Sequence, residues 1–357
     1  MLAGTVSNDI SYILPRRVVR IQRKGHPLLR RISIVLMVLY VAGTIIGGIG
    51  LGEMAVHPGR RPIPVNEIKS DLKTLNANLQ DVSISASDGA VLRGWFLRPA
   101  SGNGNAIILL HGVSDNRLGM YGYGEWLLRN GYSVLLPDAR AHGLSGGELA
   151  TYGLKESDDI HRWVSWLEEN AQPRCVFGFG ESMGAGQILQ ALTKEARFCA
   201  VVAESPFESF REVSYARFGR PFHAGPWLGR TFFWPTDEVG FLYVRLRYGL
   251  DMDSASPKKA VAATNVPVFL IHGTSDRNIP SYNSEDIQAA NPSRVILWLV
   301  PQAEHCGAHA VAPEEFNRRI LAWFSGHSSP KPENPAETIP DSLDHLTAHG
   351  SARDQLR

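Results

Sequence analysis

A serine flanked by glycines is the first residue of the sequence with the setting of a reactive group. The stretch Gly178–Gly186 reads GFGESMGAG and places Ser182 between Gly180 and Gly184, after the apolar run RCVF and before the helix-like run QILQAL. A serine on a tight strand-to-helix turn is exposed above a sheet, at the positive end of the helix dipole. Glycines on both sides leave room for such a turn. Since short matches also occur by chance, Ser182 is predicted as a nucleophile only if a base and an orienting acid accompany it.

Two later segments supply these partners. Asp276 lies in IHGTSDRNIP and His305 lies in PQAEHCGAH, each directly after an apolar, strand-like run. The carboxyl ends of parallel strands meet at one edge of a sheet, where open α/β folds bind ligands. The chain order serine, acid, histidine on such loops is typical of one hydrolase architecture. We therefore predict acyl transfer with Ser182 as nucleophile, His305 as general base and Asp276 as the residue that orients the base.

Other residues compete for these roles. Glu204 follows the strand-like run CAVVAE and is the alternative acid; its other expected role is to fix the hinge of an inserted segment. His309 is the alternative base, which its expected place near the start of the last helix disfavours. His111, His142 and His272 each precede a glycine at a strand end, where ordering of loops is expected rather than proton transfer.

An acyl-transfer site also needs hydrogen-bond donors for the oxyanion that forms at the attacked carbonyl. The backbone N–H of Met183, the residue after the nucleophile, is one predicted donor. The backbone N–H of Val113, in HGVSDNR after the strand-like run Ala106–Gly112, is the other. No metal-ligand spacing is present in the sequence, so no metal is expected.

The elements that position these residues alternate between strand and helix. The run VSISASDGAVLRGWFLRP predicts a hairpin, and six further apolar runs predict strands, which together indicate an eight-stranded, mostly parallel sheet over residues 72–325. The alternation stops over residues 206–262. Twelve of the 32 aromatic residues fall between Phe207 and Tyr248, so this insertion is predicted to be a small helical cap over the carboxyl edge of the sheet.

The N-terminal part predicts a membrane anchor. The run from Ile32 to Leu51 is apolar and uncharged, and it predicts a transmembrane helix over residues 32–52. A helix of this length spans a hydrocarbon core of about 30 Å in the lipid bilayer. A basic cluster lies within residues 1–31, which puts the N-terminus in the cytoplasm and the catalytic domain on the periplasmic or extracytoplasmic side of the membrane. A cleaved signal peptide is the alternative, disfavoured by the long basic region and the lack of an A-x-A site. The Gly43/Gly47 and Gly48/Gly52 pairs have the spacing of packed membrane helices, but we interpret them as ordinary glycine usage.

Composition argues against a nucleic-acid-binding protein and against a disulfide-rich protein. The net charge is +1, with no basic field suited to nucleic acid. Three cysteines are too few and too scattered for a disulfide framework, and Cys175 and Cys199 are expected to be buried reduced thiols. Residues 53–71 predict a Pro-rich linker, and residues 326–357 predict a disordered polar tail.

Five motifs together resemble the α/β-hydrolase superfamily: LLHG, PDARAHGLSGG, GFGESMGAG, IHGTSDRNIP and PQAEHCGAH, within residues 75–325. The sequence is most similar to the branch with serine aminopeptidase-like hydrolases and membrane-anchored α/β-hydrolase-domain proteins. This resemblance implies the α/β-hydrolase fold, the roles given above for Ser182, His305 and Asp276, and no cofactor. Ala141 departs from the family pattern, which often has glycine there, in a loop that shapes the site and carries no proton.

The aromatic cap predicts a small-molecule carboxylic ester with an apolar acyl or aromatic group as the substrate. A serine peptidase with the same three residues is the alternative, and it would need an acid such as Glu204, Asp237 or Glu238 to recognise a free N-terminus. A non-enzymatic scaffold of the same fold is the second alternative, which the intact serine, histidine and aspartate disfavour.

Overall fold

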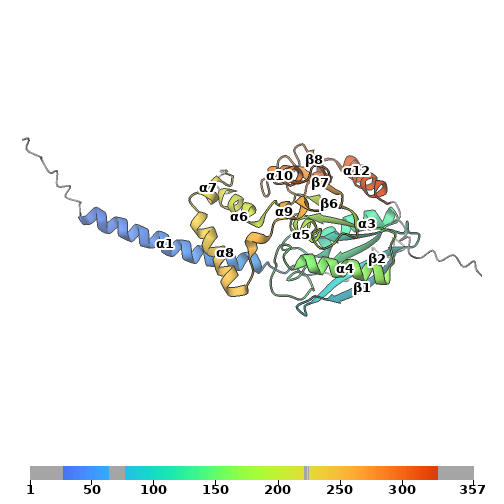
Figure 1. Cartoon of the computed structure of the whole chain (residues 1–357), viewed down its shortest axis with the longest axis horizontal. Helices are drawn as coiled ribbons and strands as arrows, with labels where there is room; N and C mark the ends of the chain where they lie inside the picture. Colours follow the sequence, from blue (N-terminus) through green and yellow to red (C-terminus); the bar gives the residue numbers. More distant parts are fainter. Residues whose placement is uncertain (1–26, 64–76, 221–222, 224, 329–357) are drawn as a thin grey trace, which may run out of the picture. The chain divides into compact units, whose positions relative to one another are not determined.

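The computed structural model describes residues 27–63, 77–220, 223 and 225–328. A long helix, α1, comes first in the chain, and a sheet flanked by helices follows (Figure 1). The sequence-based expectations for residues 1–26, for linker residues 64–71 and for the tail beyond residue 328 lie outside the described residues.

The eight strands form a single sheet in the order β1-β2-β4-β3-β5-β6-β7-β8. The β1–β2 and β2–β4 pairs are antiparallel, and all other neighbouring strands are parallel. This confirms the predicted eight-stranded, mostly parallel sheet. The strands are β1 (Ala77–Ser85), β2 (Val91–Pro99), β3 (Ala106–Leu110), β4 (Ser133–Pro137), β5 (Val176–Glu181), β6 (Phe198–Glu204), β7 (Val268–Gly273) and β8 (Val295–Val300).

Helices cover both faces of the sheet. Successive side chains of a strand point to opposite faces, so Ile108 of β3 belongs to one apolar cluster and Leu109 to the other. Because both faces are covered, the central strands are continuous apolar runs. The first cluster includes residues of α4 (Glu156–Asn170), α5 (Met183–Ala191), α9 (Pro257–Ala262) and α10 (Tyr282–Ala290). The second includes residues of α3 (Tyr121–Arg129), which follows the short η1 (Arg117–Met120), and of α11 (Ala308–Val311) and α12 (Pro313–Gly326).

The segment between β6 and β7 is helical, as predicted. Before α9 it contains α6 (Phe210–Gly219), α7 (Trp227–Arg230), α8 (Trp234–Tyr248) and the short η3 (Met252–Ser254). A third apolar cluster joins Val213 and Val244 of this cap to Tyr152 and Met183 of the sheet domain. The cap therefore packs over the residue that follows Ser182 in the chain.

The helix α1 (Pro27–Val56) extends the predicted span of residues 32–52 at both ends. By length and composition it is able to cross a membrane, and it is the one such helix within the described ranges. Its residues up to Thr44 and those from Ile45 onward belong to two separate compact units, and the second unit also contains the sheet and the cap.

Two glycines near the end of α1 pack against the cap helix α8. A Cβ atom on Gly48 would lie 2.7 Å from a Val239 side-chain atom, and one on Gly52 would lie 3.2 Å from the carbonyl oxygen of Gly240. Small residues allow two helix backbones to approach this closely. The interpretation of the Gly48/Gly52 pair as ordinary glycine usage was therefore wrong, and the helix that requires the spacing belongs to the same chain.

The residues that follow α1 are bound to the sheet domain. The guanidinium group of Arg60 donates hydrogen bonds to carbonyl oxygens of the loop after β4, including those of Ser145 (2.6 Å) and Gly147 (2.9 Å). Arg61 forms an ion pair with Asp115 (3.1 Å). The described part of the predicted linker, residues 53–63, thus begins as the last turn of α1 and continues as a docked segment.

Cys175 and Cys199 are joined by a disulfide bond. The register of β5 against β6 shifts here: Val176 pairs with Phe198 and Phe177 pairs with Ala200, so that Cys199 is skipped. The two cysteine Cα atoms lie 5.7 Å apart, within the usual range for a disulfide. The expectation of two reduced thiols was wrong, because the register shift that brings the cysteines together has no signature in either strand's own sequence.

Candidate active site

Ser182 lies on the turn between β5 and α5 in a backbone conformation that is unusual for a residue other than glycine, with φ 51° and ψ −111°. The turn is tight on both sides. A Cβ atom on Gly180 would lie 2.5 Å from the carbonyl carbon of Gly184, and one on Gly184 would lie 2.3 Å from the carbonyl oxygen of Leu110. Both positions therefore require glycine, as the sequence predicted, and the Ser182 conformation is held by the packing around it.

Ser182, His305 and Asp276 form a hydrogen-bonded line. The Nε2 atom of His305 lies 2.9 Å from Ser182 Oγ, and its Nδ1 atom lies 2.7 Å from Asp276 Oδ2. His305 follows β8 and Asp276 follows β7, so the carboxyl ends of three strands bring the three side chains together. The structure thus places next to each other the three residues that the sequence singled out.

The carboxylate of Asp276 is buried and well supplied with donors. Its Oδ1 atom accepts the backbone N–H groups of Asn278 (2.8 Å) and Ile279 (2.9 Å). Burial alone would raise the pKa of Asp276, but hydrogen bonds with His272 and His305 hold this pKa below its ordinary value. An ionised Asp276 accepts the Nδ1–H of His305, which leaves the Nε2 lone pair of that ring directed at the Ser182 hydroxyl.

The rival acid and base lie elsewhere. Glu204 Oε1 accepts the backbone N–H of Ala308 (3.0 Å), and its Oε2 atom has no hydrogen-bond partner among the described residues. The ring of His309 packs edge-on against Phe316, with centroids 5.3 Å apart. The geometry therefore favours Asp276 over Glu204 as the partner of His305.

The three histidines at strand ends form hydrogen bonds with neighbouring segments of the chain. His111 Nδ1 donates to the adjacent backbone carbonyl (2.7 Å), and its Nε2 accepts the N–H of Ala139 (3.1 Å). His142 bonds a backbone carbonyl through Nδ1 (2.8 Å), and His272 Nδ1 bonds Ser284 Oγ (2.6 Å). Burial lowers the pKa of His111 and of His142, so both rings are neutral near pH 7. Within the described residues no group of three or more His, Cys, Asp or Glu side chains is arranged to hold a metal ion.

The two predicted oxyanion donors belong to segments that adjoin Ser182. Met183 is the first residue of α5, so its N–H is among those that have no partner within the helix. The loop that carries Val113 lies against the nucleophile, because a Cβ atom on Gly112 would be only 3.7 Å from Ser182 Cβ. Donors from these two positions would approach an oxyanion at Ser182 from the α5 side and from the β3 loop.

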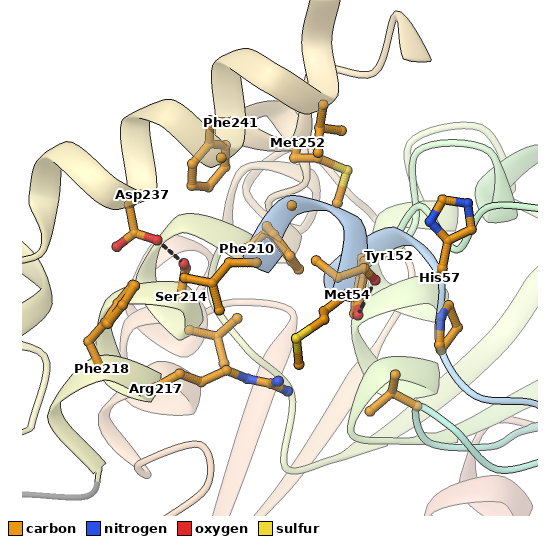
Figure 2. Close-up of a pocket in the computed structure, with 18 of the residues that line it drawn as sticks. Met54, His57, Tyr152, Phe210, Ser214, Arg217, Phe218, Asp237, Phe241 and Met252 are labelled. Carbon is orange, nitrogen blue, oxygen red and sulfur yellow. Dashed lines mark hydrogen bonds between the residues drawn. The ribbon is translucent and has the colours of Figure 1, made fainter. Parts of the chain in front are cut away.

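A pocket of about 460 Å³ extends from Val113 and Ser114 beneath the cap (Figure 2). Apolar side chains of the cap line much of it, including Phe210, Phe241 and Met252. Figure 2 shows Asp237 and Phe218 on one side of this space and Tyr152 and His57 on the other. The last part of α1 and the residues after it supply a further side, which we call the α1 wall. The α1 wall consists of Leu51, Gly52, Met54, Ala55, His57, Pro58 and Gly59.

The α1 wall was not predicted from the sequence. Apolar length and proline content are the strongest local signals there, and they predict an anchor over residues 32–52 and a linker after it. The Gly48/Gly52 spacing was the signal that a helix packs against α1, but a single sequence does not reveal which helix.

Buried Glu204 and half-buried Glu181 lie at the ends of neighbouring strands, β6 and β5, close to the site. Burial and the proximity of Glu181 raise the pKa of Glu204 to about 8, and burial also raises the pKa of Glu181. Nearby Asp276 adds to the effect on Glu204. Glu204 is therefore protonated in the folded chain at pH values where an unfolded chain, with a pKa near 4.5, has released the proton.

We expect this burial to make stability depend on pH. Between about pH 5 and pH 8 the folded state binds more protons than the unfolded state, so the free energy of unfolding falls as the pH rises. The substitution Glu204→Gln keeps an oxygen for the Ala308 N–H but cannot ionise, so it is expected to reduce this fall by about 1 kcal/mol or more. Chemical unfolding in detergent at pH 5 and pH 8 measures the difference. Glu169→Gln, at an exposed position of α4, is the control; an unchanged slope in Glu204→Gln would contradict the prediction.

The comparison with known proteins agrees with this geometry. Residues 107–319, more than half of the chain, match the alpha/beta hydrolase family. The chain belongs to this family. The match runs from β3 to α12, so this α/β-hydrolase carries Ser182, Asp276 and His305 inside the matched region. This match confirms the resemblance that the five motifs indicate. Solved structures of an esterase and of a peptidase have a similar hydrolase fold.

Relatives and solved structures extend the comparison. The uncharacterized protein YqkD of Bacillus subtilis is 30% identical over 247 residues, which cover 68% of this α/β-hydrolase and 77% of YqkD. The esterase Pf2001 of Pyrococcus furiosus is 28% identical with a TM-score of 0.57, over 71% of this chain and 94% of the esterase. The acylaminoacyl peptidase of Pyrococcus horikoshii shares the fold at 18% identity with a TM-score of 0.56, over 74% of this chain and 44% of the peptidase.

Proposed function

We propose that this α/β-hydrolase is a membrane-anchored serine hydrolase that cleaves carboxylic esters. The observation that carries the proposal is the line from Ser182 Oγ through His305 to Asp276, with contacts of 2.9 Å and 2.7 Å. A serine so placed is activated by the adjacent base, and the base is held in one tautomer by the acid.

The reaction follows from the three side chains. His305 Nε2 takes the proton of Ser182 as Oγ attacks the ester carbonyl, and the resulting imidazolium is stabilised by Asp276. The N–H groups of Met183 and Val113 donate to the oxyanion of the tetrahedral intermediate. His305 then gives its proton to the departing alcohol, which leaves an acyl group on Ser182. Water, deprotonated by His305, attacks this acyl-enzyme and releases the carboxylic acid.

The pocket supports an ester with an apolar acyl group. Its lining is predominantly apolar and aromatic, which suits the burial of a hydrocarbon group next to Val113. The Pyrococcus furiosus protein, an esterase that is 28% identical to this chain, supports the same substrate class.

A peptidase remains the second candidate because of one acid in the pocket. Of the three acids that the sequence offered for recognition of an N-terminus, Asp237 lines the pocket. It is buried, its Oδ1 accepts a hydrogen bond from Ser214, and its Oδ2 has no partner among the described residues. Glu238 pairs with Arg211, and Glu204 bonds the N–H of Ala308.

Two observations support the proposed anchor and its orientation. The basic residues before α1 favour a cytoplasmic N-terminus, which leaves the sheet domain on the extracytoplasmic side. The Cys175–Cys199 disulfide suits an oxidising compartment.

Labelling with a fluorophosphonate tests the nucleophile and the orientation together. In detergent, the wild-type chain is expected to be labelled on Ser182 and the Ser182→Ala variant to stay unlabelled. A charged, membrane-impermeant fluorophosphonate is expected to label the wild type in intact spheroplasts. Absence of labelling in detergent would overturn the hydrolase proposal, whereas labelling only after lysis would overturn the orientation alone.

The substrate class is tested on the unlabelled wild-type enzyme in detergent. We expect turnover of p-nitrophenyl esters with an apolar acyl chain to exceed that of aminoacyl-p-nitroanilides. Faster turnover of the aminoacyl-p-nitroanilides, together with loss of that turnover in Asp237→Asn, would make the chain a peptidase that binds a free amine.

A further inference from the structure

The α1 wall supplies seven of the 21 residues that line the pocket. The remaining lining comes from the cap, from Tyr152, from Val113, which is a predicted oxyanion donor, and from its neighbour Ser114. Without the α1 wall, the pocket would be open along one side. The helix that the sequence presents as an anchor is therefore also part of a pocket that reaches Val113, one of the two predicted oxyanion donors.

Specific contacts hold the α1 wall in place. The hydroxyl of Tyr152 donates to the carbonyl oxygen of Ala55 (2.9 Å), and the N–H of Ala150 donates to that of Val56 (2.9 Å). The hydroxyls of Tyr243 and Tyr248 on the cap both donate to Glu53. These contacts join α1 to both the sheet domain and the cap, as expected of a permanent wall.

The chemistry of the wall suits a hydrocarbon chain. Leu51, Met54 and Ala55 face the same pocket as the aromatic side chains Phe210 and Phe241 of the cap. Leu51 and Gly52 are also the last residues of the predicted membrane span, so the pocket begins where the apolar part of α1 ends. An amphiphilic ester with its chain in the bilayer and its carbonyl group at the surface matches this arrangement.

We infer that the α1 wall is a substrate-binding element, which contacts the acyl chain of a membrane-derived ester and sets the chain length that is accepted. This inference rests on the proposed ester hydrolysis at Ser182. It adds a role to α1 beyond anchoring: removal of the helix would alter selectivity as well as location.

A substitution that fills the pocket from the α1 side tests this role. Ala55 lines the pocket, and its contact with Tyr152 uses only the backbone, so Ala55→Phe narrows the space and keeps that hydrogen bond. The full-length chain in detergent is assayed with p-nitrophenyl acetate, butyrate, octanoate and palmitate. We expect the ratio of kcat/KM for octanoate to that for acetate to fall by about tenfold or more.

The matched control lies on the same helix. Ile46 is 72% exposed and does not line the pocket, so Ile46→Phe adds the same ring to α1 outside the wall. It is expected to leave the chain-length ratio unchanged. An unchanged ratio in Ala55→Phe, or equal shifts in both variants, would overturn the inference.

A binding measurement covers the case in which Ala55→Phe does not fold. An octanoate ester with a diazirine at the end of its acyl chain is irradiated with the full-length Ser182→Ala variant, and the cross-linked residues are identified by mass spectrometry. We expect cross-links within Leu51–Gly59 that excess unlabelled octanoate ester suppresses.

Cross-links confined to the cap, with ester hydrolysis intact in the wild type, would overturn the role of the α1 wall and leave the proposed function standing. Cross-links at the wall without any ester hydrolysis by the wild type would overturn the proposed function and retain the binding element.

Discussion

Replacing Ser182 with alanine is expected to lower kcat for a p-nitrophenyl ester by about 10⁴-fold to 10⁶-fold. The Oγ atom lies 2.9 Å from His305 Nε2, and we expect no other side chain to take over as nucleophile. KM is expected to change little, because the pocket is formed by the cap, the α1 wall and the Val113 loop. Steady-state kinetics of the full-length chain in detergent measure both constants.

Ser205 provides a matched control for this experiment. It is buried and, like Ser182, has a positive φ (50°), and its Oγ atom accepts the backbone N–H of Cys306 (3.2 Å), the residue next to His305. Ser205→Ala therefore removes a hydroxyl close to the site without touching the Ser182–His305 contact, and kcat is expected to stay within about tenfold of the wild type. Equal losses of kcat in the two variants would mean that Ser182 supports the structure of the site and is not the nucleophile.

The site could be predicted from the sequence because each of the three site residues directly follows the end of a strand. Ser182, Asp276 and His305 follow β5, β7 and β8, and parallel strands bring their carboxyl ends to one edge whatever the details of packing. The same reasoning favoured Asp276 but left Glu204 open as the alternative acid, because both follow strands. Their different hydrogen bonds, to His305 and to the Ala308 N–H, separate them in the structure.

The features that escaped prediction depend on contacts between distant segments. The Cys175–Cys199 bond requires a register shift between β5 and β6, and strand sequences carry little information about such a shift. The α1 wall requires α1 to dock on α8, some 190 residues later in the chain. Apolar length predicts a membrane span equally well for a free anchor and for one whose end lines a pocket.

Asp276→Asn is expected to lower kcat by about 10³-fold to 10⁴-fold. Asp276 Oδ1 accepts two backbone N–H groups, so an asparagine here would keep its amide oxygen at that position and turn its NH₂ group toward His305 Nδ1. His305 would then accept at Nδ1 and carry its proton on Nε2, which faces Ser182. In that tautomer the ring cannot take the serine proton, although the side chains keep nearly the same positions.

Comparison with Glu204→Gln makes the Asp276 experiment decisive. Glu204 is equally buried and is the alternative acid, but its hydrogen bond goes to the N–H of Ala308. The rate of fluorophosphonate labelling and kcat are expected to fall together in Asp276→Asn, with KM nearly unchanged, while Glu204→Gln keeps both rates. The opposite pattern would transfer the orienting role to Glu204. It would also require His305 to leave its 2.7 Å contact with Asp276 during the reaction, since one Nδ1–H cannot serve both carboxylates.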